Sequence, residues 1–154
     1  MKITIIAVGS NIPIWVDNVW HDYAKRLQKN YKIDLKEIKS EDRKSNQNIK
    51  KIILNEAKKI SLAIPKNSLI IALDEHGEDF STQKLTEFII KSSEYPITFI
   101  IGGADGLDDS IRKTCHKMIK LSSLTFPHHI VRILLIEQIY RCWSIINKHP
   151  YHRI

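Results

Sequence analysis

Three short runs in this sequence are almost uniformly apolar, and they constrain the fold more than any other feature. The runs are ITIIAV at 3–8, SLIIALD at 68–74 and PITFIIGG at 96–103. A strand with one face in water alternates apolar and polar residues, whereas a strand buried on both faces does not. These runs therefore predict a parallel sheet that is covered on both sides.

Apolar residues at helical spacing separate the runs. At 33–38 apolar and charged residues alternate, which is typical of an edge or half-exposed strand, and Ser81 is a suitable helix N-cap. The helices are expected at 13–29, 49–64, 81–93, 108–117 and 128–146, and two further strands at 33–38 and 118–123. This βαβαβαβαβα order predicts an α/β fold with right-handed crossovers between parallel strands.

The chain has 154 residues, of which 43% are hydrophobic, so it can bury one sizeable core. We expect a single domain with a mobile polar loop at 39–48. Its two cysteines, Cys115 and Cys142, have no CxxC spacing, which favours reduced packing residues over a disulfide or a zinc site. No run approaches the roughly 20 apolar residues of a membrane span, and the N-terminus lacks a signal-peptide pattern. We therefore expect a cytoplasmic protein.

The formal net charge is +7, and its placement is more informative than its size. Lysines scattered among Ile and Asn also arise in AT-rich genomes without any function. Near the C-terminus, however, basic residues gather with histidines, where they could attract a phosphate backbone and release its counterions. These residues are Arg132, Arg141, Lys148, Arg153, His128, His129, His149 and His152.

Three loops leave apolar strands at their carboxyl ends, where open parallel sheets bind ligands. They are LDEHG after 69–73, IGGADG at 101–106 and LSSLTFPH at 121–128. The glycine turn is not a dinucleotide fingerprint, because Ala104 stands where a glycine is needed, and it lacks the GK[ST] of a P-loop. On its own, such a sequence is more often a tight turn than a cofactor site.

The segment 121–154, LSSLTFPHHIVRILLIEQIYRCWSIINKHPYHRI, adds a set of polar groups to an apolar helix and a short tail. With IGGADG, it resembles the RlmH family of knotted, SPOUT-class methyltransferases, which methylate a pseudouridine of large-subunit ribosomal RNA. The resemblance runs from the MKITIIAVG opening to the HPYHR tail and is strongest after residue 96. It implies a parallel-sheet α/β SPOUT fold with a C-terminal trefoil knot, in one domain, 1–154, whose knotted cofactor-binding part spans about 70–154.

The same resemblance implies a cofactor, S-adenosylmethionine, held by the three loops inside the knot, largely through backbone groups. Phe126 stands where a smaller aliphatic residue would be usual, a departure that backbone binding tolerates. The implied cofactor-binding residues are Leu73, Gly102, Gly103, Leu121, Ser122, Ser123, Leu124, Thr125 and Phe126.

Glu137 and Arg141 are four residues apart in the favourable order for a helical ion pair. They form either a solvated salt bridge or a unit in which Glu137 orients Arg141 toward the pocket, where its guanidinium grips a phosphate or a base carbonyl. Arg132 is equally compatible with a surface position near the helix start.

The HPYHR tail also permits two interpretations. It is either a basic tail that becomes ordered on RNA, or, by the resemblance, Tyr151, His152 and Arg153 complete the pocket of a neighbouring subunit. No carboxylate or cysteine completes a ligand set with His149 and His152, so no metal site is expected.

The resemblance implies methylation at N3 of a pseudouridine in 23S ribosomal RNA on the assembled ribosome. We assign Arg141 or Arg153 to stabilising the developing imide anion, and His152 to removing the proton. Two alternatives stay open: another SPOUT-class enzyme acting on a ribose 2'-hydroxyl or a tRNA base, and a non-enzymatic ribosome-binding protein.

The partners implied are the ribosome and a second copy of this chain, with no DNA and no membrane. An apolar stripe on the last helix is richer than one side of a helix needs, which also favours a homodimer. Its members are Ile130, Ile133, Leu134, Ile139 and Trp143.

Overall fold

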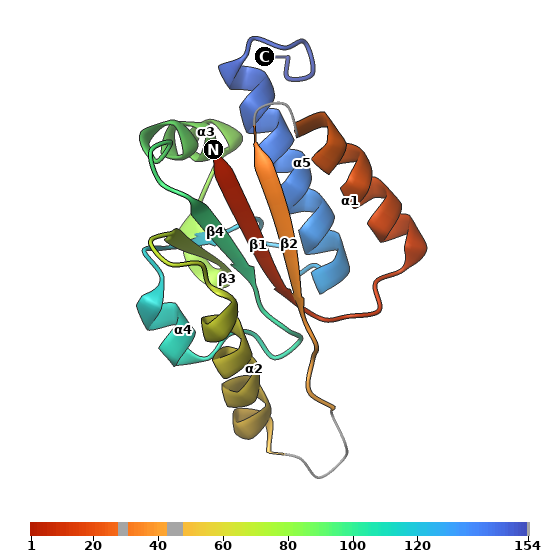
Figure 1. Cartoon of the computed structure of the whole chain (residues 1–154), viewed down its shortest axis with the longest axis vertical. Coiled ribbons are helices and arrows are strands. Elements are labelled where there is room, and N and C mark those ends of the chain that lie inside the picture. Colours follow the sequence, from red (N-terminus) through yellow and green to blue (C-terminus); the bar gives the residue numbers. More distant parts are fainter. Residues whose placement is uncertain (28–30, 43–47, 154) are drawn as a thin grey trace.

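The computed structural model describes residues 1–27, 31–42 and 48–153. Strands and helices alternate along this part of the chain, as the sequence pattern predicts (Figure 1). The elements are β1 (Lys2–Val8), α1 (Ile14–Leu27), β2 (Lys32–Ile38), α2 (Ile49–Ala63), β3 (Leu69–Asp79), α3 (Thr82–Lys91), β4 (Ile97–Ile101), α4 (Asp109–Thr114), β5 (Lys117–Lys120) and α5 (His128–Ile146).

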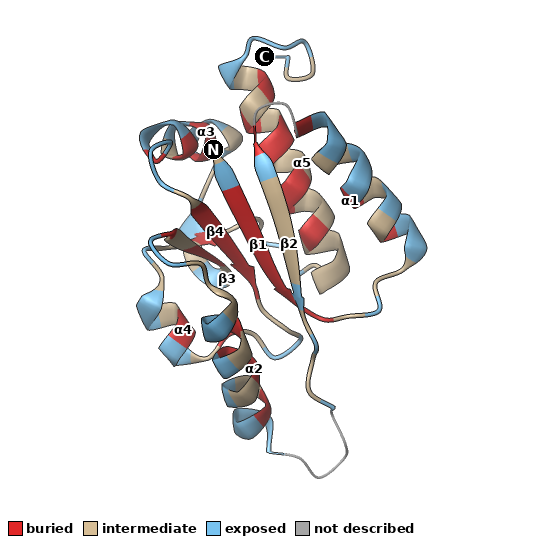
Figure 2. Ribbon diagram, viewed as in Figure 1, coloured by how far each residue is buried: buried red, intermediate tan, exposed pale blue. Residues whose placement is uncertain are grey.

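The strands form one sheet in the order β2-β1-β4-β3-β5, and every pairing is parallel. The parallel sheet predicted from the apolar runs is therefore confirmed. β1 and β4 lie inside the sheet and are buried almost throughout, whereas β2 is an edge strand of intermediate exposure (Figure 2). This difference matches their sequences, because β2 alternates charged and apolar residues and β1 does not.

Helices cover both faces of the sheet. Ile3, Ile5 and Ala7 point to the face covered by α1, α3 and α5, while Ile6 and Val8 point to the face covered by α2 and α4. This alternation is the two-residue period of a strand, with an apolar neighbour on each side. Full burial of one such side chain stabilises the fold by about 1.5–3 kcal/mol.

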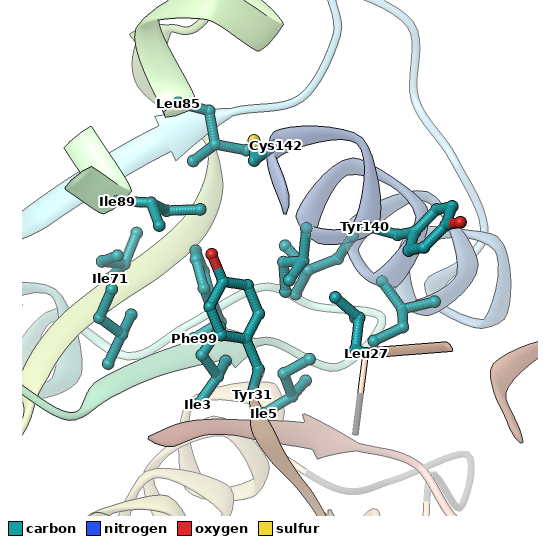
Figure 3. Close-up of a cluster of buried hydrophobic side chains, with 14 of the residues drawn as sticks. Ile3, Ile5, Leu27, Tyr31, Ile71, Leu85, Ile89, Phe99, Tyr140 and Cys142 are labelled. Atoms are coloured by element: carbon teal, nitrogen blue, oxygen red, sulfur yellow. The ribbon is translucent and has the colours of Figure 1, made fainter. Parts of the chain in front are cut away.

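Figure 3 shows the larger of the two cores, where side chains of α1, α3 and α5 meet those of the sheet. Leu85 and Ile89 of α3 lie near Cys142 of α5 over the strands. Cys142 is fully buried and, like Cys115, forms no disulfide. The prediction that both cysteines are free is confirmed.

β3 is longer than its sequence predicts. The apolar run was expected to stop at Asp74, but the strand continues to Asp79, and its register with β5 shifts between Leu73 and Glu78. Gly77 allows this close pairing, because a Cβ there would lie 2.6 Å from the backbone carbon of Ile119. The polar loop expected after β3 is thus a bulge that rejoins the sheet.

Several element ends agree with expectation. α1 starts directly after Pro13, α5 spans His128–Ile146, and Ser81 caps α3 by accepting a hydrogen bond from the Lys84 amide at 3.1 Å. α4 and β5 end earlier than predicted. Of the expected elements, the end of the first helix and residues 43–47 of the expected 39–48 loop lie outside the described residues. No helix in the described part of the chain is long and apolar enough to cross a membrane.

Candidate functional site

A cavity of about 840 Å³ opens beyond the carboxyl ends of β3, β4 and β5. Small-molecule sites in proteins typically enclose about 300–1,000 Å³. The parallel pairing of these strands brings their three following loops to one edge of the sheet. The first turn of α5 forms a further wall through Pro127, His128 and Val131.

The cavity brings together every residue that the sequence assigned to cofactor binding. Leu73 comes from β3, the two glycines from the turn after β4, and the rest from the loop between β5 and α5. These lining residues are Leu73, Gly102, Gly103, Leu121, Ser122, Ser123, Leu124, Thr125 and Phe126. The three loops identified in the sequence therefore share one site.

The glycine turn gives the cavity a wall made of backbone. Gly103 and Gly106 form an antiparallel bridge, with the Gly106 amide donating to the Gly103 carbonyl at 3.1 Å. Gly106 has a φ of +82°, which favours glycine, and a Cβ on Gly102 would lie 3.1 Å from the Gly106 carbonyl group. Side chains are excluded there, so a ligand can approach peptide groups directly.

An ion pair that the sequence pattern did not indicate supports the rim of the cavity. Arg112 Nε of α4 donates to Asp74 Oδ2 at 2.9 Å, and His76 Nδ1 lies 3.1 Å from Asp74 Oδ1. Desolvation acts to raise the pKa of Asp74, but hydrogen bonds from the His76 amide and Arg112 outweigh it, so this pKa lies below its usual value. The pair ties the bulge after β3 to α4, and nothing in the spacing of these residues indicated it.

A second ion pair, in which the arginine is buried, lies where α5 meets the ends of β1 and β2. Arg132 is only 1% exposed, and its Nη1 donates to Glu37 Oε1 of β2 at 2.6 Å. Its Nη2 donates to the carbonyl of Gly9, the residue that follows β1. The interpretation of Arg132 as a surface residue is therefore wrong. Buried charges persist where a partner and hydrogen bonds compensate for desolvation, as they do here.

In the second half of α5 and the tail after it, four polar residues form what we call the tail cluster: Glu137, Arg141, Tyr151 and His152. Arg141 donates to Glu137 Oε1 from both Nε, at 3.0 Å, and Nη2. Tyr151 donates to the same oxygen at 3.0 Å, and Arg141 Nη1 lies 3.4 Å from His152 Nδ1. The pKa of Arg141 lies above its usual value, mainly because of the hydrogen bond to Glu137.

The tail cluster does not line the cavity of its own chain. α5 has 19 residues, so at 1.5 Å per residue it is about 28 Å long. Its start lies at the cavity, and its end lies at the opposite end of the sheet, near the N-terminus of β1 (Figure 1). The expected pairing of Glu137 with Arg141 is observed, and Arg153 is exposed beyond it. Any action of these residues on a ligand in the cavity requires a second chain.

A parallel sheet with helices on both faces and a backbone-walled cavity beyond its strand ends is typical of α/β proteins that bind small molecules. Residues 1–152 match the sequence model of a family described as predicted SPOUT methyltransferase. The match covers nearly the whole chain, and this protein therefore belongs to the SPOUT methyltransferase family.

Similar proteins within the family carry a more specific name. The chain is 44% identical over 155 residues to the ribosomal RNA large subunit methyltransferase H of Bordetella petrii, covering 99% of each chain. It is also 44% identical over 156 residues to the protein of that name from Herminiimonas arsenicoxydans, covering all of both chains. The relative from Bordetella pertussis gives 44% over 155 residues.

Proposed function

We propose that this protein transfers a methyl group from S-adenosylmethionine to N3 of a pseudouridine in large-subunit (23S) ribosomal RNA, on the assembled ribosome. One observation carries the proposal. All nine residues assigned to the cofactor from the sequence line a single cavity in a chain that belongs to a methyltransferase family. The RNA target is that of the relatives named above, which are ribosomal RNA large subunit methyltransferases.

The cavity suits S-adenosylmethionine in size and in chemistry. Its volume of about 840 Å³ lies in the range of cofactor sites. Gly102, Gly103 and the Leu121–Phe126 loop offer backbone donors and acceptors for the adenine and methionine ends, and Leu73 and Leu107 offer apolar contact. We further propose that the part from about residue 70 onward forms the trefoil knot expected from the sequence.

S-adenosylmethionine, when bound, would supply an electrophilic methyl group on a positively charged sulfur, with a neutral thioether as the leaving group. The protein must then align the nucleobase and remove the N3 proton. Arg141 or Arg153 would stabilise the negative charge that develops on the imide. Glu137 holds Arg141 in place, and the resulting ion pair keeps the guanidinium pointing in one direction.

His152 is our candidate for accepting the N3 proton. Arg141 carries only donors, so in their 3.4 Å contact the acceptor is His152 Nδ1, and the neutral ring then carries its hydrogen on Nε2. His152 would take up the proton at Nδ1 once the nucleobase displaces this contact with Arg141.

A homodimer would place the tail cluster of one chain at the cavity of another. Ile130, Ile133 and Leu134 of the predicted apolar stripe remain partly exposed, which supports such an interface, whereas Ile139 belongs to the core of its own chain. Trp143 Nε1 is buried without a hydrogen-bond partner among the described residues. Its own chain covers this atom, so a partner chain cannot reach it, and Trp143 adds no support for the interface. Light scattering should show a dimer at micromolar concentration, and a monomer would contradict this part of the proposal.

Mapping modified nucleosides by mass spectrometry tests the target. Ribosomal RNA from a strain lacking this gene should lack one N3-methylated pseudouridine, and the wild-type gene should restore it. An Arg141→Ala gene should restore it about 100-fold less efficiently, the typical loss when one charge-stabilising group is removed. Loss of a ribose methyl or of a tRNA modification would favour the other SPOUT activities. Failure to bind S-adenosylmethionine in calorimetry would favour a non-enzymatic ribosome-binding protein.

A further inference from the structure

Tyr151 attaches the C-terminal tail to the fold, together with His149, whose amide donates to the Ser144 carbonyl at 2.8 Å. Among the described residues after α5, Tyr151 packs against the main apolar core, whereas residues 147–150 are exposed. Its ring lies 4.7 Å from that of Tyr140 between centroids, and Arg141 Cζ lies 5.0 Å from its centroid. The position of His152, the next residue, therefore depends on how Tyr151 is held.

The hydroxyl of Tyr151 belongs to a hydrogen-bond chain with a defined direction. Its oxygen lies 3.0 Å from Glu137 Oε1 and 2.9 Å from the Tyr23 hydroxyl. The carboxylate can only accept, so the single hydroxyl hydrogen of Tyr151 is donated to Glu137. Tyr23 must then donate to Tyr151, which gives the order Tyr23 to Tyr151 to Glu137.

This chain links three parts of the molecule. Tyr23 is on α1 and lies 128 residues before Tyr151, and its ring is 5.7 Å from that of Tyr140 on α5. Burial, together with the hydrogen bonds to Tyr23 and Glu137, raises the pKa of Tyr151 above its usual value, so Tyr151 remains a donor at neutral pH. Glu137 also accepts from Arg141, so the same carboxylate fixes both the tail and the guanidinium.

We propose that Tyr23 is a positioning residue for methyl transfer: its hydroxyl fixes Tyr151 and thereby presents Arg141 and His152 to the nucleobase as one rigid surface. This inference rests on the proposed function and assigns a role to a residue outside the cavity and the tail cluster. Without the Tyr23 hydroxyl, Tyr151 keeps its bond to Glu137 but loses one of the contacts that limit its movement over α5.

Tyr23→Phe removes only this hydroxyl and keeps the ring in the core. We expect it to lower kcat for methylation of unmethylated large ribosomal subunits about tenfold, equivalent to about 1.4 kcal/mol. The Kd for S-adenosylmethionine should stay within about twofold, because Tyr23 is not among the residues that line the cavity and the variant leaves those residues unchanged. Tyr95→Phe is the matched control, since Tyr95 is 57% exposed and lies between α3 and β4.

A double-mutant cycle separates positioning from a general structural role. If Tyr23 acts through Tyr151, the Tyr23→Phe/Tyr151→Phe protein should be no less active than Tyr151→Phe alone. If the losses of activity in the two single variants instead multiply in the double variant, the inference is overturned. It is also overturned if Tyr23→Phe is as active as Tyr95→Phe. Thermal unfolding at one protein concentration checks that the variants fold. If Tyr23→Phe does not fold, Tyr151→Phe tests the same hydrogen bond by removing the other hydroxyl.

Failure of the inference can be told apart from failure of the proposed function. If the wild-type protein transfers no methyl group to ribosomal RNA, the proposed function fails and the role of Tyr23 with it. If the wild type is active and Arg141→Ala is not, while Tyr23→Phe matches its control, only the positioning role is overturned.

Discussion

Replacing Arg132 by methionine should destabilise the protein far more than the same change at an exposed arginine. Methionine keeps much of the apolar stem of arginine but removes the charge and every donor. Arg132 is 1% exposed and bonds to the carboxylate of Glu37 and to the carbonyl of Gly9, a buried residue. The variant thus leaves a buried carbonyl without its donor and a carboxylate without its cation.

The magnitude follows from the exposure of each partner. A buried acceptor left unsatisfied costs about 1–3 kcal/mol. The side chain of Glu37 is 37% exposed, so water still solvates it. Leaving Glu37 without its cation therefore costs about 1 kcal/mol, below the 3–5 kcal/mol typical of a fully buried pair. We expect a total loss of about 3 kcal/mol, which for a chain of this length lowers Tm by about 6–12 °C.

Arg26→Met is the matched control. Arg26 pairs with Asp22 at 2.7 Å on α1, and both side chains are about half exposed. Such a pair contributes about 0.3–0.5 kcal/mol. Urea unfolding should be measured at one protein concentration, because the stability of a dimer depends on concentration. If Arg132→Met lost no more free energy of unfolding than Arg26→Met, Arg132 would not be the tie between α5 and the ends of β1 and β2.

Three further outcomes are expected. Gly102→Ala should raise the Kd for S-adenosylmethionine about tenfold in calorimetry, because its Cβ would lie 3.1 Å from the Gly106 carbonyl group and the turn must open; an unchanged Kd would contradict the backbone-walled site. Burial raises the pKa of Cys142 from 9.0 to about 11, so its stabilising effect is complete below about pH 9 and is lost as the pH rises through about 11. Cys142→Ala should therefore flatten the alkaline decline of the free energy of unfolding, and an identical slope would refute this. Ser81→Ala should cost about 1 kcal/mol in urea unfolding through loss of the α3 cap, whereas no loss would show that the cap is dispensable.

Local pattern was enough to predict most of the sheet. The strands β1 and β4 are buried on both faces, so each needs an apolar residue at every position, and this pattern is visible without any knowledge of neighbours. The end of β3 could not be predicted in this way. Residues 74–77 are polar or glycine and indicate a loop, but after them Glu78 and Asp79 pair with β5 again, and that pairing is a tertiary contact.

In the candidate site, too, local pattern predicted some features, whereas others depend on tertiary contacts. Loops at the carboxyl ends of parallel strands must share an edge of the sheet, so the cavity could be located from the strand predictions together with the family resemblance. Arg132 could not be placed, since its anchor, Glu37, lies 95 residues earlier on an edge strand. Tyr23 also lacked a local signal, because its contact with Tyr151 depends on how α1 packs against α5.

The most direct test of the central claim is transfer of a labelled methyl group by the purified protein. Large ribosomal subunits from a strain lacking this gene would be incubated with the protein and S-adenosylmethionine carrying a deuterated methyl group, and the nucleosides analysed by mass spectrometry. The account predicts one deuterated methyl group, located on N3 of a pseudouridine. No transfer, or a label on a ribose, would contradict it.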